Sequence, residues 1–146
     1  MKTKVFIIID SLGPGGAQRQ IVEYLKLADH TRFEIAIINM DKNYDTLANQ
    51  IDQSKCRIIG ITHSGFINLL TLIKLTRLFK KEKPDIVHTY LFTADCYGRL
   101  SAKLAGVPAC GCTLAYSAPK SFLALSIAIV STSSTYSQPL YQRDLG

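Results

Sequence analysis

The sequence has no apolar run long enough to cross a membrane. A transmembrane helix needs about 20 consecutive apolar residues, and the runs at residues 5–9 and 122–130 are much shorter. A turn containing Asp10, glycine and proline follows the first run at once, which does not fit a secretory signal. We therefore expect a cytoplasmic protein, with peripheral contact at the inner face of the cell membrane as an open alternative.

The spacing of the cysteines is not that of a metal or redox motif. No two cysteines form a C-x-x-C pair, and only three histidines could complete a zinc site. We expect no metal site. Buried free thiols in a reducing compartment are the favoured interpretation of the four cysteines, which are Cys56, Cys96, Cys110 and Cys112.

Several signatures of cofactor binding and catalysis are also missing. Counted from Gly13, the sixth position of a dinucleotide-binding fingerprint is occupied by Gln18. No Lys-Ser or Lys-Thr pair follows the turn, so it is not a Walker loop. There is no Ser-His-Asp order and no close carboxylate pair. We expect neither a redox cofactor nor bound ATP, and the sequence predicts no resident cofactor.

The composition is that of one globular domain with a basic surface. The chain has 146 residues, of which 47% are hydrophobic and 19% charged, and its formal net charge is +6. A positive charge favours acidic partners such as phosphates, anionic lipids or nucleic acid. Nucleic acid is disfavoured, because the basic residues do not interleave with aromatic ones and no binding module is present.

Strand-like and helix-like segments alternate along the chain. Such alternation predicts an α/β fold, a Rossmann-like parallel sheet with helices on both faces. The segment at 109–114 is a weaker strand candidate because of Gly111, and residues 115–146 form an irregular, Ser-rich tail that we expect to be truncated or poorly ordered. We expect one domain at 1–114, with strands at 5–9, 33–38, 57–61 and 85–88 and helices at 16–28, 46–51, 66–81 and 94–105.

The turn after the first strand is a candidate anion site. Gly15 and Gly16 stand at the start of a helix, where free backbone N–H groups and the helix dipole favour a phosphate. Arg19 could face the same anion or simply solvent, and Asp10 could contact a sugar or form the turn. Glycines at such turns also serve packing alone, and this structural alternative is equally weighted.

A second candidate site lies at the fourth strand. His88 ends the predicted strand and could hydrogen-bond a ligand or move a proton, although most such histidines are structural. Tyr90 would project to the same side, where its hydroxyl could touch a ligand or its ring could cover the core.

The predicted helix at 66–81 is amphipathic and basic toward its end. Such a helix can lie on an anionic lipid surface. It can also pack on the sheet with a solvated basic end, which is the favoured interpretation. The basic residues concerned are Lys74, Arg77, Lys80 and Lys81.

Three segments together resemble the N-terminal, acceptor-side domain of retaining, nucleotide-sugar-dependent glycosyltransferases with the GT-B fold, the group 1 or family 4-like enzymes. Residues 12–19 (LGPGGAQR) resemble the Gly-Gly-Ala-Glu-Arg loop of that family, with Gln18 in place of Glu. Residues 83–89 (KPDIVHT) are similar to its Pro-Asp-aliphatic-aliphatic-His signature, and residues 95–108 to the helix and Gly-Val-Pro turn that follow.

The resemblance implies half of an enzyme that moves a sugar from a nucleoside diphosphate to a sugar or lipid-linked hydroxyl acceptor in polysaccharide or glycolipid synthesis. Gly15 and Gly16 would approach the donor diphosphate, and His88 would contact the donor sugar. Tyr90 replaces the second histidine of the His-x-His pair common in the family. Because the nucleotide-holding second domain is not in these 146 residues, we expect the chain alone to be inactive. The alternatives are a non-catalytic acceptor- or membrane-binding subunit of a split glycosyltransferase and a small phosphate-binding domain.

Overall fold

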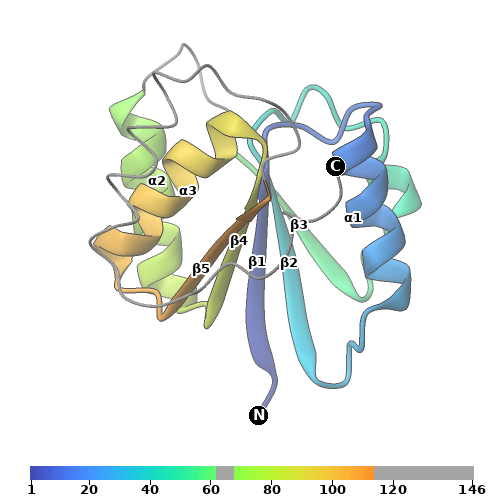
Figure 1. Ribbon diagram of the computed structural model, residues 1–146, viewed down its shortest axis with the longest axis horizontal. Coiled ribbons are helices and arrows are strands. Elements are labelled where there is room, and N and C mark those ends of the chain that lie inside the picture. Colours follow the sequence, from blue (N-terminus) through green and yellow to red (C-terminus); the bar gives the residue numbers. More distant parts are fainter. Residues whose placement is uncertain (62–67, 114–146) are drawn as a thin grey trace, which may run out of the picture.

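A computed structural model of the chain shows a parallel sheet with helices on both of its faces, as the sequence predicts (Figure 1). It describes residues 1–61 and 68–113. The predicted tail at 115–146 lies outside these residues, so the domain division stays a prediction. The elements are β1 (Thr3–Ile9), α1 (Gly16–Leu27), β2 (Phe33–Asn39), the 3-10 helix η1 (Ala48–Gln50), β3 (Cys56–Gly60), α2 (Leu69–Glu82), β4 (Ile86–Tyr90), α3 (Phe92–Ala105) and β5 (Ala109–Thr113).

The order of the strands places a switch point in the middle of the sheet. The five strands run β3-β2-β1-β4-β5 and all pair in parallel. The chain moves outward from β1 to β3 on one side and from β4 to β5 on the other. The carboxyl ends of β1 and β4, which pair as Ile9 with Tyr90, are therefore where such a sheet opens a crevice for ligands.

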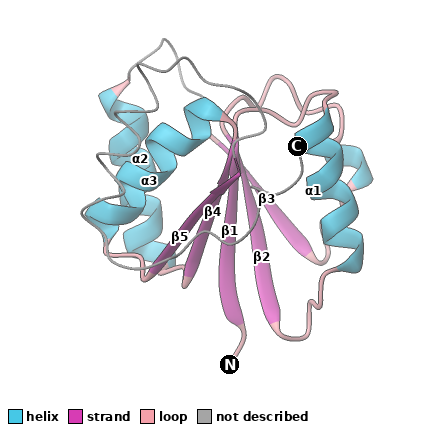
Figure 2. Cartoon of the chain, viewed as in Figure 1, coloured by secondary structure: helices cyan, strands magenta, loops and turns pink. Residues whose placement is uncertain are grey.

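Strand β1 is apolar on both faces because both are covered (Figure 2). Val5, Ile7 and Ile9 pack with α1 and its neighbours, whereas Phe6 and Ile8 belong to the core beneath α2 and α3. The Phe6 and Phe79 rings meet edge to face with centroids 6.0 Å apart. A continuous run of isoleucine, which alternation alone would not explain, is typical of a central parallel strand.

Close packing of α3 on the sheet depends on a glycine in its middle. A Cβ on Gly98 would clash with Thr89 Cγ2 and lie 2.8 Å from Ile8 Cδ1. The helix therefore touches β4 and β1 directly, and this contact holds its first turn at the carboxyl edge of the sheet.

Some local expectations were wrong. Strand β4 continues to Tyr90, so His88 lies in its middle and not at its end. The helix predicted at 46–51 is only the short η1, and α3 begins two residues earlier than expected, at Phe92. Of the four cysteines expected to be buried, only Cys56 is, and burial raises its pKa to about 11; Cys96, Cys110 and Cys112 are exposed thiols.

The helices of the described residues are all too short or too polar to cross a bilayer.

Candidate functional site

The helices α1 and α3 both begin at the carboxyl edge of the sheet, beside the switch point. α1 follows β1 after the glycine turn, and α3 follows β4 immediately. The first N–H groups of a helix have no partner within it and carry the positive end of its dipole. Two positive helix ends therefore lie at this edge.

The N-terminus of α1 is open. Its N-cap, Gly15, has extended backbone and no side-chain cap, and no acidic residue stands in the first turn. The first helical hydrogen bond runs from the Arg19 N–H to the Gly15 carbonyl at 3.0 Å. Gly16 is exposed, and a Cβ placed on it would meet nothing within 4 Å. The arrangement leaves backbone N–H groups accessible to an anion.

The other glycines of the turn are tied to protein atoms. A Cβ on Gly13 would clash with the Tyr44 ring, so this position serves packing. A Cβ on Gly15 would clash with Gln18 Oε1, because the Gln18 side chain, 9% exposed, folds back over the turn. Gly16 is thus the position of the turn at which the absence of a side chain leaves space for a ligand.

Arg19 lies in the first turn of α1 and is exposed. Among the ion pairs formed by the described residues, none includes its guanidinium. It is free to approach an anion held at the start of its own helix.

Asp10 caps the other helix. Its carboxylate accepts hydrogen bonds from the Ala94 N–H at 2.5 Å and the Thr93 N–H at 3.4 Å. Asp10 follows β1 directly, so the cap joins β1 to the start of α3.

The first turn of α3 also carries a buried carboxylate. Asp95 accepts a hydrogen bond from the Thr89 hydroxyl at 2.7 Å. Arg99 holds it in a bidentate pair at 2.6 and 2.7 Å, and the two side chains are 3% and 15% exposed. Arg99 also reaches Cys112 Sγ at 3.0 Å, which links α3 to the edge strand β5.

His88, Tyr90 and Thr113 form a polar group on the α1-facing side of β4 and β5. The Thr113 hydroxyl lies 2.9 Å from His88 Nε2, and the His88 and Tyr90 rings are 4.8 Å apart between centroids. Burial lowers the pKa of His88, although the Asp95 carboxylate opposes this. Burial raises the pKa of Tyr90, with a hydrogen bond to Thr113 acting in the opposite direction. Both rings therefore favour their neutral forms at neutral pH, in which each can donate and accept a hydrogen bond.

The other nitrogen of His88 faces a position without a side chain. His88 pairs in register with Gly111, and a Cβ there would lie 3.5 Å from His88 Nδ1, an ordinary contact distance. Glycine at this position leaves Nδ1 uncovered from that side.

Two residues of this region have no signal in the sequence. Thr113 belongs to a strand that Gly111 made doubtful, so its contact with His88 could not be foreseen. Leu91, between β4 and α3, has φ 69° and ψ 173°, a backbone conformation that is almost confined to glycine. The tight step from β4 into α3 imposes this conformation.

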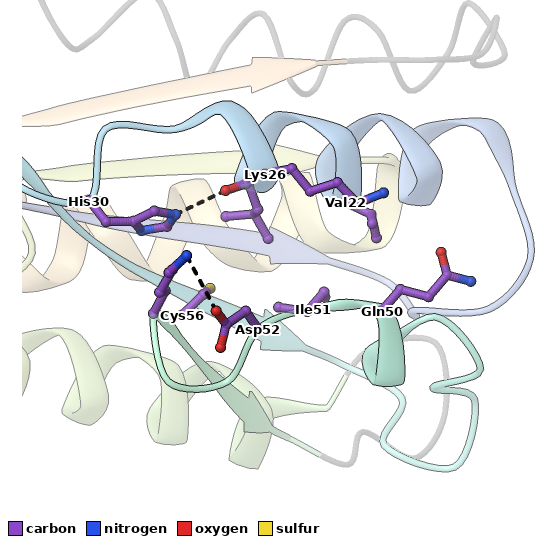
Figure 3. A pocket seen from close by; sticks show the side chains of 9 residues that line it. Val22, Lys26, His30, Gln50, Ile51, Asp52 and Cys56 are labelled. Carbon is purple, nitrogen blue, oxygen red and sulfur yellow. Dashed lines mark hydrogen bonds and ion pairs between the residues drawn. The ribbon is translucent and has the colours of Figure 1, made fainter.

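A separate hollow of about 250 Å³ lies between α1 and the segment that leads into β3 (Figure 3). In it the His30 Nε2 donates to the Leu25 carbonyl at 2.9 Å, and Lys55 pairs with Asp52 at 3.5 Å. None of the predicted site residues lines this hollow. It is thus a different place from the glycine turn and the His88 group.

The described residues include no set of side chains that is typical of a metal site. Within residues 1–61 and 68–113, no group of three or more His, Cys, Asp or Glu side chains is placed to hold a metal ion.

Comparisons with known proteins find similarity to glycosyltransferases in each case. Residues 19–134, starting just after the glycine turn, match the family described as Glycosyl transferase 4-like. The chain is 36% identical over 97 residues to the UDP-Gal:alpha-D-GlcNAc-diphosphoundecaprenol alpha-1,3-galactosyltransferase of Escherichia coli, covering 64% of this chain and 24% of that protein. The fold matches a crystal structure of a glycosyltransferase from Rickettsia africae ESF-5 with TM-score 0.64 and 21% identity, covering 85% of this chain and 33% of that one. The chain spans a minor part of either relative.

Proposed function

Because this chain belongs to the glycosyl transferase 4-like family, we propose that it is the acceptor-side lobe of an enzyme that moves a sugar from a nucleoside diphosphate to a hydroxyl acceptor. The observation that carries the proposal is the open start of α1 at the switch point, with Gly16 exposed and no cap on the helix. A diphosphate fits this place, because both its charge and its hydrogen-bond acceptors match what the helix end offers.

In this proposal the glycine turn stabilises the leaving group. Cleavage of the bond between sugar and diphosphate builds negative charge on the departing oxygens. The N–H groups at Gly15 and Gly16, the dipole of α1 and the exposed Arg19 would stabilise that charge more than they stabilise the bound donor. This differential stabilisation lowers the barrier to transfer.

The remaining site residues are assigned to the sugars. We assign the uncovered side of His88 to the donor sugar, since a neutral imidazole can donate or accept one hydrogen bond. Tyr90 and the Asp10 carboxylate are assigned to the acceptor. Both residues stand at the paired ends of β4 and β1, next to the turn that would hold the diphosphate.

We propose the acceptor class and the cellular location by analogy with the relative. The name of the E. coli protein describes a galactosyltransferase acting on an undecaprenyl-diphosphate sugar. We propose a lipid-linked sugar acceptor for this family member too, and a position in the cytoplasm at the inner face of the membrane. Free thiols at all four cysteines agree with a reducing compartment.

Donor binding is tested by following backbone amides in NMR spectra of the isotope-labelled chain. UDP-galactose, UDP and inorganic diphosphate should shift the amide signals of residues 15–19, and free galactose should not. Binding should be weak, because the second lobe would supply most of the contacts to the nucleotide. Shifts centred instead on the hollow lined by Lys26, Asp52 and Lys55 would contradict the proposed site. Tight binding of a mononucleotide would favour a phosphate-binding domain of another kind.

Dependence on a second lobe is tested by turnover. We expect the purified chain to transfer no detectable sugar from a panel of nucleotide sugars, because catalysis needs both lobes closed on the diphosphate. Measurable transfer by this chain alone would overturn the two-lobe proposal and leave the diphosphate assignment open to the NMR test.

A further inference from the structure

The exposed side of α2 is apolar in the first turns of the helix and positively charged in the later turns. In its first turns the exposed residues are apolar: Leu69 is 66% exposed, Leu70 64% and Ile73 36%. Its later turns expose four cations, Lys74, Arg77, Lys80 and Lys81. At 3.6 residues per turn these positions fall within an arc of about 140°, so they form one surface, which we call the α2 outer face.

The opposite side of α2 packs against the rest of the protein. Thr71, Leu75 and Phe79 are buried, the last two in the core beneath α2 and α3. The single acidic residue of the helix, Glu82, pairs with Arg57 at 3.0 Å and Lys4 at 3.7 Å. Within residues 1–61 and 68–113, the α2 outer face is therefore not part of the core, and its residues include no carboxylate.

The four cations of the α2 outer face form no salt bridge with a described residue. The exposed side of α1 differs, because Lys26 there pairs with Glu23 at 2.7 Å. Unpaired cations on one helix face, held together by a rigid backbone, attract an extended anionic surface better than scattered charges do.

We infer that the α2 outer face is the surface by which this protein binds an anionic lipid bilayer. The cations would lie at the headgroups, while Leu69, Leu70 and Ile73 enter the boundary between headgroups and acyl chains. Nucleic acid fits less well, because the face has no aromatic side chain on which a base could stack. From the proposed function the inference takes only the membrane location of the acceptor, and it can be tested without any sugar transfer.

The charge part of the inference is tested by sedimentation with vesicles. The 146-residue chain should bind phosphatidylcholine vesicles containing about one third phosphatidylglycerol, should bind pure phosphatidylcholine far less, and should be released by high salt. Changing Lys74, Lys80 and Lys81 to Gln should weaken binding to the anionic vesicles at least about tenfold. The matched control changes Lys26, Lys42 and Lys55 to Gln, which removes the same net charge from exposed positions outside α2.

The apolar part is tested by one substitution and its counterpart. Leu70→Ser should weaken vesicle binding about fivefold, because it removes an inserted apolar side chain. Leu27→Ser, at a position 87% exposed on the opposite face of the sheet, should have little effect. Circular dichroism of each variant confirms that it is folded.

Three outcomes would overturn the inference. One is a wild-type chain that does not bind anionic vesicles at low salt. Another is an equal loss of binding in the two lysine triples, which would show that net charge alone is responsible. The third is a dimer in sedimentation velocity that Leu70→Ser disrupts, which would make a second copy the partner of this face. None of these results bears on diphosphate binding at the glycine turn.

Discussion

The two helices that begin at the carboxyl edge of the sheet differ in how their positive ends are satisfied. At α3, Asp10 accepts from the first-turn N–H groups and Asp95 adds a carboxylate within the first turn. At α1 there is no side-chain cap and no acidic residue in the first turn. The protein neutralises one helix end with its own carboxylates and leaves the other open.

The two helix ends at this edge of the sheet therefore have different roles, one in stability and one in binding. A capped helix end stabilises the fold and offers little to an anion, whereas an open end costs stability and offers an anion site. The open end is also the one beside an exposed glycine. We therefore expect substitutions at α3 to change mainly stability and substitutions at α1 to change mainly ligand binding.

The largest effect should come from Asp95. Asp95→Ala leaves the mostly buried Arg99 guanidinium without its partner, and we expect the free energy of unfolding to fall by about 3 kcal/mol. Urea denaturation followed by circular dichroism measures the loss. The double variant with Arg99→Ala should lose less than the two single variants added together, because the second change removes the unpaired charge. Strict additivity would show that the pair is not coupled.

Removal of the cap from α3 should have the next largest effect. Asp10→Ala takes the acceptor from the Thr93 and Ala94 N–H groups, and we expect a loss of about 1–2 kcal/mol in unfolding free energy. Asp10→Asn keeps an acceptor oxygen without the charge, so it should lose about half as much. An unchanged stability in Asp10→Ala would remove the contrast between the two helix ends.

The open end can be made to resemble the closed one. Gly16→Asp places a carboxylate in the first turn of α1, where nothing obstructs it, and should raise stability by about 0.5 kcal/mol through the helix dipole. The same change should abolish the NMR response to diphosphate by repulsion. Gly16→Asn is the matched control without charge, and it should weaken the response only by its bulk. A full response to diphosphate in Gly16→Asp would place the anion elsewhere.

The smallest effect should be a dependence of stability on pH that comes from His88. Because burial keeps the pKa of His88 below its ordinary value, the unfolded chain binds the proton first as the pH falls. Stability should therefore decline as the pH drops below about 6.5, and His88→Gln should remove that part of the decline. Stability measured at intervals between neutral and mildly acidic pH gives the two slopes. Equal slopes would show that His88 titrates as it does in the unfolded chain.

Local pattern was sufficient for much of the fold. The alternation of apolar strands with amphipathic helices predicted a parallel α/β sheet, and the structure confirms it. The family match over residues 19–134 confirms the resemblance to glycosyltransferases, and it includes the segments at 83–89 and 95–108. The position of the open glycine turn at the carboxyl edge also followed from the sequence, because a turn between a parallel strand and its helix always lies there.

Element ends and exposures were less well predicted. The end of β4 was placed at His88, although pairing with β1 carries the strand on to Tyr90. Cysteines of the edge strand β5 were expected to be buried, because cysteine usually is, but this strand has only one paired neighbour among the described residues. Propensity describes a residue type, whereas exposure depends on what packs beside it.

The amino-acid sequence therefore specified the elements and their apolar faces, since periodicity and turn chemistry act between near neighbours in the chain. The contacts that give those elements their roles required the folded molecule. Asp10 reaches the start of α3 across more than eighty positions of sequence, and Thr113 meets His88 only because β5 pairs with β4. The α2 outer face is defined only in the folded molecule, where the other side of that helix packs into the core. Such contacts depend on the packing of all elements together, and no local pattern encodes them.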